Sequence, residues 1–175
     1  MCNGKATKRI EEFQGHTKEY TAILQLGATT VSYDMEHEEN EHFPTEHITR
    51  ELIISTLQQF IGDIEQVPPT YSAVKINGDR ACDLRRAGEE VTLRTKNVHI
   101  DDIEVTDFDA EKMLLSIHVV CGKGTYIRAL ARDLGRALGS GAYLTALRRT
   151  RVGDFTIDKC LDSEQIQEWL VQTDK

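Results

Sequence analysis

GKGTYIRALARDLGRALG, residues 122–139, joins a glycine loop to a strongly patterned stretch. The apolar residues after the loop recur at the spacing of one helical face and predict a helix over residues 126–138. The expected buried stripe comprises Ile127, Leu130, Ala131, Leu134 and Leu138. Because Arg132 and Arg136 fall outside this stripe, the pattern does not require either of them to be buried.

Two alternating segments predict the strands on which this helix packs. Residues 111–122 place an apolar side chain at every second position, and residues 18–27 do the same. The next patterns predict a helix over 48–61 and a strand that ends in the Asn77-Gly78 turn. A short helix within 79–91, closed by Gly88, and a strand and turn over 95–109 follow. Residues 28–47 are polar and predict a loop or short strands; 141–157 predict a short helix leading into a strand, and 162–170 a closing helix. This mixture predicts one α+β domain with a largely antiparallel sheet.

Composition and cysteine spacing restrict the possible classes of protein. The chain has 175 residues and a net charge of −8, which suits one soluble domain. Cys2, Cys82, Cys121 and Cys160 form no C-x-x-C pair, so neither a zinc ribbon nor a redox motif is indicated. No apolar run reaches membrane length and the N-terminus has no signal core, so we expect a cytoplasmic protein.

The two signs of charge are segregated along the chain. Residues 34–65 carry nine acidic residues and only one basic residue, Arg50. Residues 121–153 reverse this, with Asp133 the lone acid among seven basic residues: Lys123, Arg128, Arg132, Arg136, Arg148, Arg149 and Arg151. A basic face on an acidic protein would suit a polyanion such as RNA, but two solvated faces that neutralise each other fit equally well.

Several motifs allow more than one interpretation. The glycine loop could present backbone N–H groups to a phosphate, but Gly124 after Lys123 excludes the Walker A pattern. Tyr71 and Lys75 in PPTYSAVK could stack on a base and contact phosphate, or Tyr71 could belong to the core. Three histidines lie among the acidic residues of 37–47, but their spacing of five fits no single face, so we favour a solvated loop over a metal site.

Taken together, four stretches resemble the TruB-type tRNA pseudouridine synthases, in the order found in that family. They are GKATKRIEEFQGHTKEYTAILQLGATT, VPPTYSAVKINGDRACDLRRAGEEV, GKGTYIRALARDLGRALG and AYLTALRRTRVGDF. The resemblance implies the pseudouridine synthase catalytic fold, a mostly antiparallel sheet flanked by helices. It also implies an isomerase that converts the T-loop uridine at position 55 of tRNA to pseudouridine without cofactor or metal.

The resemblance also assigns roles to individual residues. It implies that Tyr20 stacks on the target base and that Tyr126 and Arg128 line the catalytic site, with Arg128 paired to the catalytic aspartate. Lys75 and Leu147 would complete the pocket. Tyr71 and Arg148 are further candidates for contact with the RNA. A non-catalytic RNA-binding domain is the alternative function.

One family motif is not found in residues 1–175. The catalytic aspartate of the family lies in a G-x-L-D-P-x-A-T-G segment upstream of the GKATK stretch, and no aspartate here has that context. We therefore expect residues 1–175 to be the C-terminal major part of the catalytic domain, without a PUA domain and inactive alone. We also expect Arg128 either to swing out or to recruit another anion, and an exposed sheet edge to favour self-association.

Overall fold

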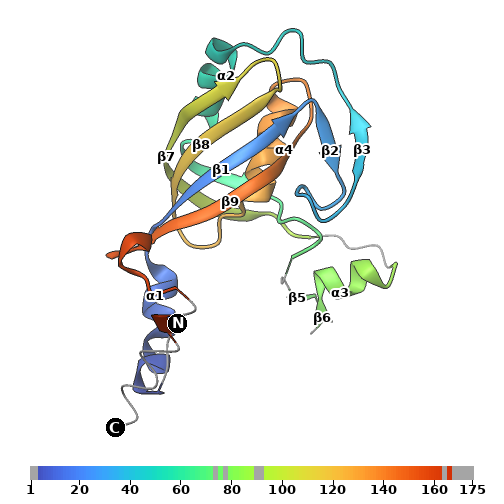
Figure 1. Ribbon diagram of the computed structural model, residues 1–175. Helices are drawn as coiled ribbons and strands as arrows, with labels where there is room; N and C mark the ends of the chain where they lie inside the picture. The colour runs from blue at the N-terminus through green and yellow to red at the C-terminus, as the bar shows by residue number, and fades with distance from the viewer. Residues whose placement is uncertain (1–3, 73–74, 77–78, 89–92, 163–164, 167–175) are drawn as a thin grey trace.

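A six-stranded antiparallel sheet forms the body of the protein (Figure 1). The structure is a computed structural model and describes residues 4–72, 75–76, 79–88, 93–162 and 165–166. From one edge to the other, the strands are β10 (Phe155–Thr156), β9 (Ala142–Val152), β1 (Lys18–Leu26), β8 (Leu114–Cys121), β7 (Lys96–Asp109) and β4 (Gly62–Gln66). The predicted α+β class and the largely antiparallel sheet are confirmed.

Two helices cover one face of the sheet and enclose the core. α4 (Ile127–Ala137) packs on β9 and β1, while α2 (Arg50–Leu57), continued by η2 (Gln58–Phe60), packs on β7. The stripe predicted for α4 is buried, with Leu130 and Leu134 fully inaccessible against Leu24 of β1 and Leu115 of β8 in the same cluster. The alternating apolar side chains of β1 and β8 therefore face the helices, as the sequence pattern predicted.

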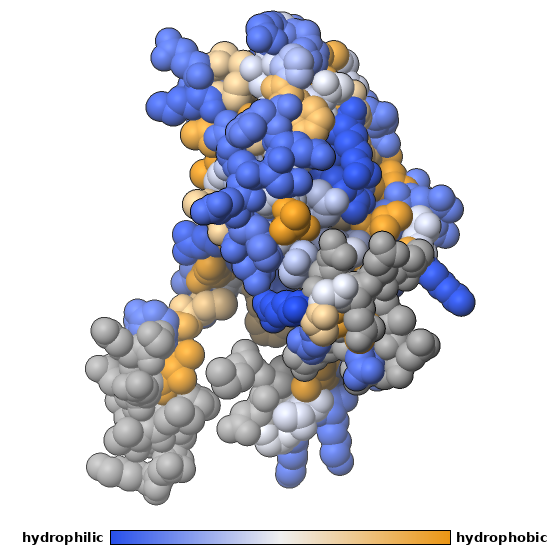
Figure 2. All heavy atoms as spheres, turned by 90° about the vertical axis from the view of Figure 1, so that its right-hand side faces the viewer, coloured by the Kyte–Doolittle hydropathy of each residue, from blue (hydrophilic) through white to orange (hydrophobic). Residues whose placement is uncertain are grey.

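Smaller elements surround this body. β2 (Ala28–Thr30) and β3 (Glu39–His42) form a hairpin beside the start of β9, and Figure 2 shows that this side of the molecule is largely hydrophilic with separate hydrophobic spots. β5 (Lys75–Ile76), β6 (Asp79–Arg80) and α3 (Ala81–Arg86) form a separate projection. η1 (Gly4–Arg9) and α1 (Ile10–Gly15) extend below the start of β1, at the lower left of Figure 1, and η3 (Ile157–Lys159) follows β10.

The structure corrects the prediction for residues 141–157. No helix forms there, because Ala142 and Leu144 are buried alternately and the whole of β9 pairs with β1. The short helix after β6 is confirmed over Ala81–Arg86. The Asn77-Gly78 turn and most of the predicted closing helix lie outside the described residues, although Asp162 accepts a bond from the Gln165 backbone N at 2.8 Å, as an N-cap would.

The outer edge of β9 is open over part of its length. Residues 146–149 are all exposed, and β10 pairs only with Arg151 and Val152. At the start of β9, the Leu144 backbone N donates to the carbonyl oxygen of Tyr33 at 3.0 Å. Between these two points, no strand of the described chain covers the edge.

Candidate functional site

Arg128, in the first turn of α4, is held by three acceptors from two distant segments. Its guanidinium donates to Asp34 Oδ2 at 2.8 Å, to the carbonyl oxygen of Tyr71 at 2.7 Å and to that of Ser32 at 3.3 Å. The side chain is only 23% exposed. A partly buried guanidinium needs such a partner, because leaving one buried charge uncompensated costs several kcal/mol. Of the two expected outcomes for Arg128, the structure shows the second, an anion beside it, and that anion is Asp34, which was not predicted from the sequence.

Asp34 is fixed by bonds to both of its carboxylate oxygens. Ser32 Oγ donates to Oδ1 at 2.6 Å, and the backbone N of Glu36 donates to the same oxygen at 3.0 Å. Partial burial alone would raise the pKa of Asp34, but these two hydrogen bonds and the Arg128 charge outweigh it and hold the pKa below its ordinary 3.8. Asp34 is therefore charged, and both of its carboxylate oxygens accept hydrogen bonds from other residues of the protein.

A cavity of about 370 Å³ opens directly beside this ion pair. Its lining combines the charged pair with mostly apolar side chains from β9 and from the loop before β3. The lining residues are Asp34, Met35, Arg128, Leu144, Thr145, Ala146 and Leu147. We call this space the Arg128 cavity. Its size and its few polar groups suit a small planar ligand with a polar edge.

Tyr20 and Arg149 lie on neighbouring strands next to this cavity. In the register of β1 and β9, Tyr20 pairs with Arg149, and Ala22 pairs with the cavity residue Leu147. Directly paired residues of an antiparallel sheet share a face, so all four side chains lie on the side that carries α4. Burial raises the pKa of Tyr20, and the nearby Arg149 guanidinium partly opposes that rise.

The predicted residue Arg148 lies on the other face of the sheet. It pairs with Thr21, one position from the Tyr20–Arg149 pair, and successive side chains of a strand point to opposite faces. The structure therefore brings Arg149, rather than Arg148, to the side of Tyr20 and Leu147. Arg149 was not predicted as a site residue because the choice between Arg148 and Arg149 depends on the register of β9, part of which the sequence pattern assigned to a helix.

The other predicted site residues have different relations to the cavity. Tyr126 precedes α4, half-buried, and its backbone N donates to Gln66 Oε1 at 2.8 Å, but it does not line the cavity. Tyr71 is half-buried, and its ring lies 4.7 Å from that of His37. Lys75 lies in β5, and its side chain is outside the described part of the structure. Arg128 and Leu147 are therefore the two predicted residues that the described structure brings into one cavity.

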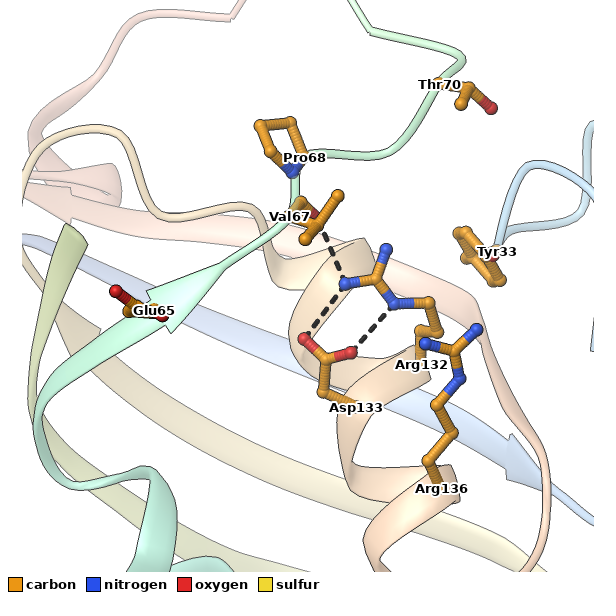
Figure 3. A pocket seen from close by; sticks show the side chains of 8 residues that line it. All are labelled: Tyr33, Glu65, Val67, Pro68, Thr70, Arg132, Asp133 and Arg136. Carbon is orange, nitrogen blue, oxygen red and sulfur yellow. Dashed lines mark hydrogen bonds and ion pairs between the residues drawn. The ribbon is translucent and has the colours of Figure 1, made fainter. Parts of the chain in front are cut away.

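A second cavity of about 370 Å³ lies further along α4 (Figure 3). Arg132, whose burial the helical pattern did not require, is 7% exposed and donates to both oxygens of Asp133 and to the Val67 carbonyl oxygen. The ring of Tyr33 lies 5.3 Å from its guanidinium carbon. A long side chain outside the apolar stripe can thus be covered by the segment at Val67, whose backbone carbonyl supplies an acceptor. Arg136 is exposed.

Replacing Asp34 with asparagine should destabilise the fold in a pH-dependent way. The carboxylate stabilises the folded state at pH values above about 3.9, its unfolded pKa, and this contribution disappears as the pH falls through the lower folded-state pKa. Since the ion pair is partly buried, we expect Asp34→Asn to lose about 1–2 kcal/mol at pH 7, between the values for exposed and buried pairs. Urea unfolding should show the difference from wild type shrinking between pH 5 and about pH 2.

Glu104→Gln provides the control for this measurement, because Glu104 is an exposed carboxylate on β7. Its substitution should leave the free energy of unfolding within about 0.5 kcal/mol of wild type. A gap between Asp34→Asn and wild type that stays constant down to pH 2 would show that the Asp34 charge does not stabilise the fold.

Two general features of the described residues bear on the class of site. No group of three or more His, Cys, Asp or Glu side chains within them is placed to hold a metal ion. None of the helices described is long and apolar enough to cross a membrane.

Comparison with known proteins identifies the family. The family model for the N-terminal domain of TruB family pseudouridylate synthases matches residues 1–127, and the model for the tRNA pseudouridylate synthase B C-terminal domain matches residues 128–175. The chain is 59% identical to the tRNA pseudouridine synthase B of Bacteroides fragilis over 174 residues, covering 99% of this chain and 74% of that protein. Its identity to the enzyme of the same name from Flavobacterium johnsoniae is 45%, covering 97% and 73%.

Solved structures agree with these sequence matches. A chain of a Cbf5-Nop10-Gar1 complex is similar with a TM-score of 0.62 and 29% identity, over 89% of this chain and 36% of that one. A chain of an H/ACA RNP bound to a substrate RNA containing 2'-deoxyuridine also gives a TM-score of 0.62, with 25% identity over 97% of this chain and 40% of that one. These matches show that the chain belongs to the TruB family of pseudouridylate synthases.

Proposed function

We propose that this chain binds the T-stem-loop of tRNA and that the Arg128 cavity receives uridine 55 after it has left the stack of the loop. The observation that carries the proposal is the cavity itself, a mostly apolar space with an oriented guanidinium at its wall, in a chain 59% identical to a tRNA pseudouridine synthase B. Uracil has two apolar faces and a polar edge, which matches this lining. The reaction is an isomerisation in which the bond between the ribose and N1 breaks and a bond to C5 forms.

Contacts with Tyr20 and Arg149 would offset part of the free energy needed to turn the base out of its stack. Turning a base out of its stack costs a few kcal/mol, and stacking on an aromatic ring returns about 1–3 kcal/mol per base. Tyr20 lies on the cavity side of the sheet, and Arg149 beside it offers a cation for a backbone phosphate. Tyr126, Tyr71 and Lys75 remain proposed contacts of the same RNA, whereas Arg149 takes the place of Arg148, which lies on the opposite face of the sheet.

We propose that residues 1–175 form the major part of a pseudouridine synthase catalytic domain. The matches of residues 1–127 and 128–175 to the N-terminal and C-terminal family models support this assignment. Turnover would then need a carboxylate that is not in residues 1–175, while RNA binding would not. The open edge at residues 146–149 supports the further proposal that two copies of the chain can pair there.

A pair of adjacent arginines tests the proposed RNA contact. Arg149→Ala should weaken binding of a T-stem-loop hairpin by about tenfold and reduce the slope of log affinity against log salt by about one, the effect of losing one phosphate contact. Arg148→Ala changes the same charge on the opposite face of the sheet and should alter affinity by no more than about twofold. Fluorescence anisotropy at several salt concentrations measures both effects.

The hairpin titration also tests the function as a whole. Wild type should prefer the T-stem-loop to a hairpin of the same stem with a permuted loop. Equal affinity for the two hairpins would contradict T-loop recognition. Equal losses for Arg148→Ala and Arg149→Ala would contradict the orientation proposed for the RNA.

A further inference from the structure

Met35 is an apolar side chain in an unexpected place. It is 68% exposed, more than any other large hydrophobic residue among those the structure describes. It belongs to the loop between β2 and β3. Leaving such a side chain in water forgoes most of the stabilisation that full burial of an apolar side chain provides.

The exposure of Met35 does not come from a loose loop. Every neighbour in this segment has a contact with another part of the protein: Ser32 and Asp34 with Arg128, Tyr33 with Arg132, Glu36 with Arg86, and His37 with Tyr71. Tyr33 also has a φ of 60°, a left-handed conformation that costs a non-glycine residue free energy and occurs preferentially at functional sites. The chain is therefore anchored on both sides of Met35 while Met35 itself projects.

Met35 projects at the wall of the Arg128 cavity. It lines that cavity together with Leu147, which is 48% exposed and comes from β9. The cavity thus has apolar side chains from two segments, and the Asp34–Arg128 pair provides its charged part. Methionine is unbranched and polarisable, so its thioether can adjust to a flat aromatic surface.

We propose that Met35 packs on the ring of the everted uracil and closes the Arg128 cavity over it. This inference rests on the function proposed above, and Met35 would be a binding residue that touches the substrate base. Closure would bury the exposed thioether and remove water from the apolar faces of the uracil ring. The polar edge of the ring would then face the Asp34–Arg128 pair. The contact depends on the base itself, and this dependence distinguishes it from a contact with the surrounding RNA.

Two hairpins test the contact, one with uridine at the target position and one with an abasic ribose there. Met35→Ala should bind the uridine hairpin about tenfold more weakly than wild type does, the loss expected for one apolar contact. It should bind the abasic hairpin within about twofold of wild type. Met35→Leu conserves most of the volume and should retain the affinity for the uridine hairpin. Ile54→Ala, an equally simple truncation on α2 at a side chain 44% exposed, should change neither affinity.

The outcomes separate this inference from the proposed function. If Met35→Ala weakens both hairpins equally, Met35 touches the flanking RNA, and the contact with the base is refuted. No weakening with either hairpin refutes it as well. If wild type does not distinguish the T-stem-loop from a permuted loop, the function itself fails. Because Met35 is exposed, its truncation should leave the denaturation midpoint unchanged, which circular dichroism checks.

Discussion

Residues 1–175 alone should release no tritium from a T-stem-loop that carries tritium at C5 of the target uridine. The isomerisation exchanges the C5 hydrogen, so tritium release reports turnover directly. In this family the reaction depends on an aspartate, and the one carboxylate lining the Arg128 cavity among the described residues is Asp34. Asp34 does not lie in the G-x-L-D-P-x-A-T-G context of that aspartate, and its Oδ1 already accepts hydrogen bonds from Ser32 Oγ and the Glu36 backbone N, so we expect it to orient Arg128 rather than to attack the substrate.

Adding a polypeptide with the family's G-x-L-D-P-x-A-T-G segment should start the release. The same polypeptide with asparagine in place of that aspartate is the matched control and should leave the reaction at background. Release by residues 1–175 without any addition would overturn this prediction, and its loss in Asp34→Asn would then identify Asp34 as the reactive carboxylate. Tight hairpin binding without release, even after the addition, would favour the non-catalytic RNA-binding alternative.

The elements predicted well from sequence are those with a long, regular pattern. α4 keeps its apolar stripe over three turns, and β8 alternates over its whole length, so local periodicity was sufficient for both. β9 was partly misassigned because its first residues, Ala142 to Leu147, form a short apolar run that fits a helix or a strand. Pairing with β1 decides between them, and that pairing joins residues more than a hundred positions apart.

The site shows the same division between local and distant information. Arg128 and Leu147 were identified through motifs that resemble those of a family, and the structure places both at one cavity. Asp34 was not identified, because its ion pair with Arg128 spans 94 positions and no spacing rule connects an acidic loop to one helix residue. Arg132 shows the same limit, since its position outside the apolar stripe gave no indication of burial and the acceptor that makes burial possible is a backbone carbonyl 65 positions away.

Gly135→Ala should be severely destabilising although alanine is the better helix former. Alanine in place of an interior helical glycine normally gains about 1 kcal/mol. Here an added Cβ would overlap the Ala142 backbone N and lie 2.6 Å from the carbonyl carbon of Gly141, so backbone atoms at the start of β9 would have to move. We expect a loss of about 3 kcal/mol or more in the free energy of unfolding, at the upper end for overpacked cores.

Gly122→Ala is the matched control, because an added Cβ there would meet its nearest atom, the His99 carbonyl oxygen, at an ordinary 3.5 Å. Its free energy of unfolding should stay within about 1 kcal/mol of wild type. Chemical denaturation of both variants measures the difference, and a Gly135→Ala midpoint at or above that of wild type would show that α4 does not pack on β9 as described.

The functional consequence follows from the position of Arg128 on α4, two turns before Gly135. At temperatures where Gly135→Ala remains folded, displacement of α4 should separate Arg128 from Asp34 and weaken hairpin binding, whereas Gly122→Ala should leave α4 in place.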